Sequence, residues 1–145
     1  MPALDASDLD IGLIPHPLAW DRWPEARALL SPALDLSDET WDAVEAQLFE
    51  GKADLGAVLK GGDLYAAMVL RTIEGKEGPV TEVFLIAGRD YQLWVPRLSS
   101  MLAEWSLKSG CVGLRAWGRP GWKRILEREG WTTPVIGFEM DLRAA

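Results

Sequence analysis

A chain of 145 residues, of which 48% are hydrophobic and 26% charged, can bury a substantial core, so we expect one domain over residues 1–145. Its 22 acidic and 15 basic residues give a net charge of −7, which argues against general binding to nucleic-acid backbones. No apolar run is long enough to span a membrane, and the acidic N-terminus does not resemble a signal peptide. These features predict a cytoplasmic protein.

Tryptophan is abundant in this chain, whereas the residue types that bind metals are scarce. Each of the eight tryptophans needs either a packed site or a binding partner for its ring. Cys111 is the only cysteine and His16 the only histidine, so we expect neither a disulfide nor a metal site. Beside Gly110, Cys111 is typical of a small buried residue, and a nucleophilic pair with His16 is the alternative.

The first part of the chain predicts a short strand and two helices. A strand over residues 11–14 precedes a helix over about 18–30, which Pro32 follows. Trp20 and Trp23 lie on this helix and either cover the sheet or lie at an interface. Ser37 is a favourable N-cap for the second helix.

Three strands follow, over residues 53–60, 64–70 and 80–87, and turns containing glycine separate them. The middle strand is almost continuously apolar, as expected of a central strand covered on both faces. Alternation in the third strand predicts that four of its side chains share one face: Thr81, Val83, Leu85 and Ala87.

A long helix comes next and ends at Gly110, and its start is open because Pro96 is acceptable only in a first turn. Its apolar stripe consists of Trp94, Leu98, Met101, Leu102 and Trp105. A strand over residues 111–117, a short helix and an alternating strand over 133–142 follow.

The short helix has clear boundaries in the sequence. Pro120 lacks an amide hydrogen and suits a first turn, and Gly130 suits the residue just past a helix end. Between them, Trp122, Ile125 and Leu126 share one face. This ending, together with the element order β-α-α-β-β-β-α-β-α-β, resembles the GNAT acetyltransferases, whose α/β fold has a central, mostly antiparallel sheet flanked by helices.

The resemblance implies a loop like Gln/Arg-x-x-Gly-x-Gly/Ala before the long helix, whose backbone amides hold the pyrophosphate of coenzyme A. Counting back from Gly110 places residues 90–95 there, and they contain no glycine and begin with an acid. An earlier frame offers Gly88, Arg89 and Tyr91 as candidate cofactor-binding residues. We therefore expect no cofactor, and acetyl-CoA if the protein is an enzyme.

The catalytic residues that the resemblance implies are only partly present. Aligning Gly130-Trp131 on the family's Gly-Phe places Leu126 where these enzymes commonly have a tyrosine that acts as general acid, and leucine cannot donate a proton. Glu82 lies on a strand where such enzymes carry a general base. Glu82 is equally typical of the polar side of an alternating strand.

A narrower resemblance covers the C-terminal part of the chain. Its motif residues are Trp105, Gly110-Cys111, Gly118-Arg119-Pro120-Gly121-Trp122 and Leu126. This pattern is similar to small GNAT-like proteins encoded by phages and prophages, some of which lie among genes for particle assembly. It implies a protein partner in the phage particle or the host, and a location in the host cytoplasm or with the virion.

The only positive cluster of this acidic chain lies in the same region. Its members are Arg115, Arg119, Lys123, Arg124 and Arg128, which form either a solvated helix face or a corner that binds an anion or a partner. In the second interpretation Trp117 and Trp122 flank Arg119 as anchors. The leading hypothesis is a non-catalytic binding protein, and the alternatives are an N-acetyltransferase with a divergent loop and a structural homo-oligomer.

Overall fold

The computed structural model describes residues 8–118, 120–133, 140 and 143, and five strands within them form one sheet in the order β1-β2-β3-β4-β5. Neighbouring strands are antiparallel from β1 to β4, whereas β4 and β5 are parallel. The strands are β1 (Leu9–Leu13), β2 (Asp54–Lys60), β3 (Asp63–Gly75), β4 (Gly78–Gly88) and β5 (Gly113–Ala116). The predicted class of a mostly antiparallel sheet is confirmed.

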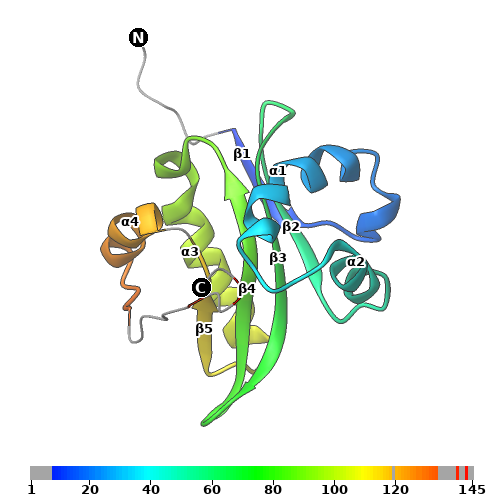
Figure 1. Cartoon of the computed structure of the whole chain (residues 1–145). Coiled ribbons are helices and arrows are strands. Elements are labelled where there is room, and N and C mark those ends of the chain that lie inside the picture. Colours follow the sequence, from blue (N-terminus) through cyan, green and yellow to red (C-terminus); the bar gives the residue numbers. More distant parts are fainter. Residues whose placement is uncertain (1–7, 119, 134–139, 141–142, 144–145) are drawn as a thin grey trace.

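Helices cover both faces of this sheet (Figure 1). One side carries α1 (Trp23–Asp35) and α2 (Trp41–Phe49), and the other carries α3 (Tyr91–Lys108) and α4 (Lys123–Arg128); the 3-10 turns η1 (Pro17–Ala19) and η2 (Pro120–Trp122) precede α1 and α4. The element order agrees with the prediction as far as α4. Most of the predicted final strand, residues 133–142, lies outside the described residues. Within the part of the chain that is described, no helix is both long and apolar enough to cross a membrane.

Three predicted boundaries of the first two helices are wrong. The first helix starts at Trp23 and continues through Pro32. Proline has no N–H to donate to the Ala28 carbonyl one turn earlier. Because Pro32 and Ala28 are both exposed, water can bond to that carbonyl instead. The second helix has Thr40 as its N-cap, and the Thr40 hydroxyl accepts a bond from the Ala43 amide at 3.2 Å. Ser37 instead closes α1, since its hydroxyl donates to the Leu34 carbonyl at 2.7 Å.

Two apolar layers, one on each face of the sheet, hold the helices in place. On the α1 and α2 side, Leu30 and Val44 are fully buried, and Trp23 lies edge-on to Trp41 with ring centroids 5.8 Å apart. Trp20 packs against the same cluster, so the first two tryptophans cover the core. On the other side, Trp94 is fully buried at the start of α3.

A β-bulge interrupts β4 at the centre of the sheet. Val69 pairs with Leu85 and Leu70 pairs with Val83, so Phe84 is an extra residue without a partner on β3. Phe84 and Leu85 both join the α1 and α2 layer, whereas Val83 joins the α3 layer. The predicted common face of Thr81, Val83, Leu85 and Ala87 is therefore wrong, because the bulge reverses the alternation after Val83.

The α1 and α2 layer predicts a clear contrast between two leucines. We expect Leu30→Ala, at a fully buried position, to lower the free energy of unfolding by about 2–5 kcal/mol because it leaves a cavity. Leu36→Ala, whose side chain is 72% exposed at the end of α1, is the matched control and should change stability little. Urea unfolding followed by circular dichroism measures both, and equal effects would contradict this packing.

Candidate functional site

The candidate site lies where β4 and β5 part. Their parallel pairing runs from Val80 opposite Gly113 to Val83 opposite Ala116, and the Trp117 amide then donates to the Val83 carbonyl at 3.1 Å. Beyond this point β4 continues to Gly88, whereas β5 has ended. The bulge at Phe84 follows directly, and bulges bend a strand and increase its twist. The two strands therefore diverge immediately after Val83.

A narrow apolar cleft lies where the two strands diverge, on the α3 and α4 side of the sheet. Its walls come from β4, α3, the end of β5 and α4, and include Val83, Ile86, Leu98, Trp117, Trp122 and Leu126. Leu126, which the resemblance aligns with a tyrosine acid, is one of these residues, so hydrocarbon stands where the family's proton donor is expected. The cleft offers apolar contact to a bound group.

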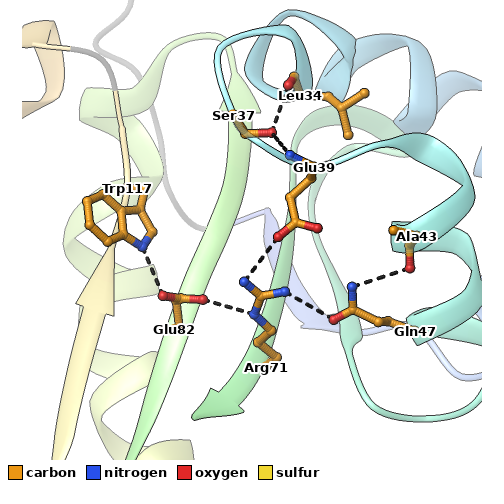
Figure 2. Close-up of polar contacts among 8 residues, drawn as sticks. All are labelled: Leu34, Ser37, Glu39, Ala43, Gln47, Arg71, Glu82 and Trp117. Atoms are coloured by element: carbon orange, nitrogen blue, oxygen red, sulfur yellow. Dashed lines mark hydrogen bonds and ion pairs between the residues drawn. The ribbon is translucent and has the colours of Figure 1, made fainter. Parts of the chain in front are cut away.

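Glu82 lies on the opposite face of the sheet, on the side of α1 and α2, and Figure 2 shows it between Arg71 and Trp117. Its side chain is only 8% exposed, yet both carboxylate oxygens have partners. The Arg71 guanidinium donates from Nε to Oε1 at 2.9 Å, and the Trp117 indole donates from Nε1 to Oε2 at 2.9 Å. A buried carboxylate is stable only when it is paired in this way.

Arg71 connects Glu82 to the helices above it (Figure 2). Its other nitrogens contact Glu39 Oε1 and Gln47 Oε1, each at 3.1 Å, and its guanidinium lies 3.9 Å from the centre of the Phe84 ring. One network thus joins five parts of the chain: the α1–α2 connection, α2, β3, β4 and the end of β5. We call Glu39, Gln47, Arg71, Glu82 and Trp117 the Arg71 network.

This arrangement bears on the prediction that Glu82 is a general base. A general base needs a free oxygen within hydrogen-bonding reach of the substrate. Here one oxygen holds a cation and the other holds an indole N–H, so the carboxylate already fulfils a structural role. The catalytic interpretation stays a prediction, and the geometry favours the structural one.

The residues predicted to hold a cofactor occupy a very short connection. Only Arg89 and Asp90 separate β4 from α3, because β4 ends at Gly88 and α3 starts at Tyr91. Pro96 lies in the second turn of this helix. The interpretation of residues 90–95 as a loop is therefore wrong beyond Asp90. Asp90 has a left-handed backbone with φ of 53°, and its side chain makes no capping bond to the helix.

Gly88 and Arg89 serve the contact between β4 and β3. A Cβ on Gly88 would lie 2.5 Å from the Ala66 Cβ and 2.6 Å from the Tyr65 carbonyl oxygen, so only glycine fits there. The Arg89 amide donates to that same carbonyl at 2.9 Å, and the Arg89 guanidinium lies 4.3 Å from the centre of the Tyr65 ring. Strand packing accounts for both residues.

Aromatic rings join the start of α3 to the start of α4. The Trp122 ring lies 5.1 Å from that of Tyr91 and 5.6 Å from that of Trp94 between centroids. The Trp94 indole donates to the Arg89 carbonyl at 2.8 Å. With no glycine in the connection, an acid at Asp90 and three packed rings beside it, the residues present do not fit the pyrophosphate of coenzyme A.

The predicted partner-binding residues differ in how far they are exposed. Trp117 is 59% exposed, and Lys123 and Arg124 are exposed on α4, where Lys123 pairs with Glu127 at 3.9 Å. Trp122 is instead half-buried among Tyr91 and Trp94, so it is not an exposed anchor. The position of Arg119 lies outside the described residues; Arg115 and Arg128 are exposed.

The surroundings of Cys111 agree with the prediction that it is a small buried residue. It is 4% exposed, and the Thr81 hydroxyl, which accepts a bond from Ser106, lies 3.4 Å from its sulfur.

Arg71, Glu39 and Gln47 are the site residues that sequence reasoning missed. A signal for Arg71 was present, because the two-residue turn between Gly75 and Gly78 sets the register that places Arg71 opposite Glu82. No local signal marks Glu39, which reaches Arg71 only through the fold.

Comparison with known proteins identifies the fold. No protein-family model and no curated protein matches the chain. Among solved structures, an aminoglycoside acetyltransferase from an uncultured soil metagenomic sample matches with a TM-score of 0.68 at 13% identity, covering 92% of this chain and 98% of that one. The ribosomal-protein-alanine N-acetyltransferase of Brucella melitensis biovar Abortus 2308 has a TM-score of 0.62 at 18% identity, covering 90% and 99%.

A GNAT family acetyltransferase of Staphylococcus aureus also matches, with a TM-score of 0.62 at 12% identity, covering 93% of this chain and 99% of that one. The chain has the GNAT acetyltransferase fold. At these identities the likeness concerns the fold, and the chemistry has to be argued from the residues at the site.

The burial of Glu82 predicts the outcome of a mutant cycle. We expect Arg71→Leu to lower the free energy of unfolding by about 3 kcal/mol, because it leaves a buried carboxylate without its cation. The double variant Arg71→Leu/Glu82→Leu should recover much of that loss. Arg27→Leu is the matched control, since Arg27 also pairs at 2.9 Å with an acid, Glu45, but in solvent, where such pairs contribute at most about 1 kcal/mol. Equal losses for Arg71 and Arg27 would contradict this interpretation.

The role of Gly88 can be tested in the same way. Gly88→Ala should destabilise the protein by about 1–3 kcal/mol because the added methyl group overlaps β3. Gly12→Ala is the control, because nothing lies within 4 Å of the Cβ position in β1. If thermal unfolding shows that Gly88→Ala is tolerated as well as Gly12→Ala, the packing role is wrong.

Proposed function

We propose that this GNAT-fold protein is non-catalytic and acts by binding a protein partner, a component of a phage particle or of its host. The observation that carries the proposal is the engagement of both Glu82 oxygens by Arg71 and Trp117. The carboxylate at the position of a general base instead fixes the orientation of an exposed tryptophan. The narrower sequence resemblance supports the phage context.

The cofactor side of the site supports the same proposal. Acetyl-CoA binding by this fold depends on backbone amides that can approach a pyrophosphate closely. Here the connection consists of Arg89 and Asp90, and Trp122 closes on Tyr91 and Trp94 beside it. A negative side chain and packed rings stand where anion-binding amides would be required.

Trp117 has the properties of a binding anchor. The residue is 59% exposed, which leaves apolar surface in water, and burying that surface against a partner is favourable. The bond from its indole to Glu82 holds the ring in place before binding, so less conformational entropy is lost in a complex. Tryptophan is among the residues that dominate binding energy at protein interfaces.

An acetyl-CoA-dependent N-acetyltransferase is the second candidate, and the divergence of β4 and β5 after Val83 favours it. This candidate requires Trp122 to leave Tyr91 and Trp94, and Glu82 to be released from Arg71. Both changes break contacts that the folded protein makes in this structure.

Calorimetric titration with acetyl-CoA distinguishes the two candidates. We expect no saturable heat, and no change in melting temperature at millimolar acetyl-CoA. A ligand present at about 100 times its dissociation constant would stabilise the protein by roughly 2.7 kcal/mol, which a thermal scan detects easily. A GNAT enzyme with an intact phosphate loop serves as positive control, and saturable binding to this chain would overturn the proposal.

A further inference from the structure

The last part of β3 has an open edge. β2 pairs with β3 only as far as Asp54 opposite Leu70, whereas β3 continues to Gly75 and stays paired with β4 along this stretch. The β3–β4 hairpin therefore extends beyond the ends of β1 and β2 (Figure 1). Among the described residues, no strand pairs with Arg71–Gly75 on the side away from β4, and we call this segment the open edge.

The backbone groups of Thr72 and Glu74 point to the open side. The Pro79 carbonyl accepts a bond at 2.8 Å from the segment that leads into β5, so the backbone of the next residue, Val80, points to β3. Its partner on β3 is Ile73. Backbone groups alternate in direction along a strand, so Thr72 and Glu74 direct their N–H and C=O groups away from β4. Both residues are exposed, and solvent satisfies these groups in the free protein.

A groove follows the open edge and is lined from both faces of the sheet. Its volume is about 510 Å³, against about 30 Å³ for the cleft between β4 and β5, so a chain segment fits in the groove and not in the cleft. The end of α2 lines it from one face and the last turns of α3 from the other. The groove therefore lies in the plane of the sheet, where an added strand would lie. Its lining includes Gln47, Asp54, Leu70, Arg71, Thr72 and Trp105.

The charges around the groove are predominantly negative. Its two lining cations are occupied, since Lys52 pairs with Glu50 at 3.0 Å and Arg71 pairs with both acids of the Arg71 network. Asp54, in contrast, makes no ion pair with a described residue, and partial burial raises the pKa of its carboxyl above the ordinary value. A second acid, Glu74, is exposed on the open edge itself. A cation supplied by a partner would stabilise the charged form of Asp54.

Asp54 and Glu74 lie on the α3 face of the groove. Asp54 is opposite Leu70, which packs in the α3 layer, and directly opposed residues share a face. Thr72 and Glu74 follow Leu70 at alternate positions and share that face too. Trp105 of α3 lines the same side. The stem of a lysine or arginine can pack against this indole while its charged group contacts the acids.

We propose that an extended basic segment of the protein partner adds to the sheet as a strand along the open edge, in the row that β2 leaves at Asp54. Its backbone pairs with Thr72 and Glu74, and its alternate lysine or arginine side chains face Asp54 and Trp105. In strand addition, main-chain bonds supply affinity and alternate side chains supply specificity. This inference rests on the proposed binding function and specifies the chemistry of the partner.

Hydrogen exchange of the whole chain, followed by nuclear magnetic resonance, tests the proposal with a blocked peptide of about seven alternating lysine and valine residues. In the free protein, the Thr72 and Glu74 amides should exchange quickly, whereas those of Arg71 and Ile73, which face β4, should exchange slowly. Saturating peptide should slow Thr72 and Glu74 about tenfold and leave the other two unchanged. No protection, or protection confined to the outer edge of β1, would overturn the proposal.

Modified peptides distinguish strand addition from charge attraction. N-methylation removes backbone donors, and in a strand the lysine and valine amides point to opposite edges. Methylating one of these two sets should abolish the protection, and methylating the other should preserve it. A peptide of alternating glutamate and valine should not bind, because Asp54 and Glu74 repel it. Equal binding of the lysine and glutamate peptides, or of the two methylated forms, would contradict strand addition of a basic segment.

A substitution in the groove tests the charge contact. Asp54→Asn should weaken the lysine peptide about two- to fivefold at low salt, as expected for one partly exposed ion pair, with a smaller difference at high salt. Asp63→Asn makes the same change at an exposed position at the opposite end of β3 and should bind normally. Unchanged melting curves show that both variants fold. Equal affinities of the two variants would contradict the role of Asp54.

The outcomes separate this inference from the proposed function. Saturable acetyl-CoA binding in calorimetry removes the proposed function itself. If acetyl-CoA does not bind and the lysine peptide leaves Thr72 and Glu74 unprotected, the binding function stands and the open edge is not its site.

Discussion

Glu82 is a charged group removed from water at the point where the sheet divides. Taking a carboxylate into a protein interior costs several kcal/mol unless cations and donors replace its hydration. Arg71 and Trp117 supply that replacement, and each can do so only if its own strand is in register with β4. The burial of this one carboxylate therefore restricts how β3, β4 and β5 are arranged.

The same constraint extends to the helices on that face. Arg71 reaches Glu39 in the α1–α2 connection and Gln47 in α2, so the ion pair at the sheet also orients the segment above it. Phe84, displaced by the bulge to this face, packs under the guanidinium. The bulge thus has two effects: it places a ring beneath Arg71, and it turns β4 away from β5 to create the cleft on the other face.

Features with local signals could be predicted from the sequence, and features that depend on distant residues could not. The hairpin turn at Gly61 and Gly62 can be predicted because a pair of glycines favours such a turn, and both residues adopt the positive φ angles that suit glycine. The bulge at Phe84 was missed because an apolar phenylalanine fits either face of a strand, and only the pairing with β3 decides. The start of α3 stays open in the sequence because Pro96 is expected only in a first turn, whereas the helix starts at Tyr91 and contains Pro96.

The site shows the same division. Sequence reasoning selected Glu82 and Trp117 individually, but it could not show that they bind each other, because they are distant in the sequence and meet only through the β4–β5 register. Gly88 was considered for phosphate binding because glycine allows close approach; the close approach is real, but it is made by β3. In a fold shared with acetyltransferases, Glu82 and Gly88 thus make contacts within the protein itself.

Hydrogen exchange at the Trp117 indole N–H tests the central claim most directly. Trp117 is 59% exposed, so an indole without a partner would exchange its proton with solvent about as fast as a tryptophan in a peptide. If Glu82 holds it, nuclear magnetic resonance should show a slowly exchanging Trp117 indole signal that becomes fast in Glu82→Gln and in Arg71→Leu. Fast exchange of this proton in the unmodified protein would contradict a Glu82 committed to structure.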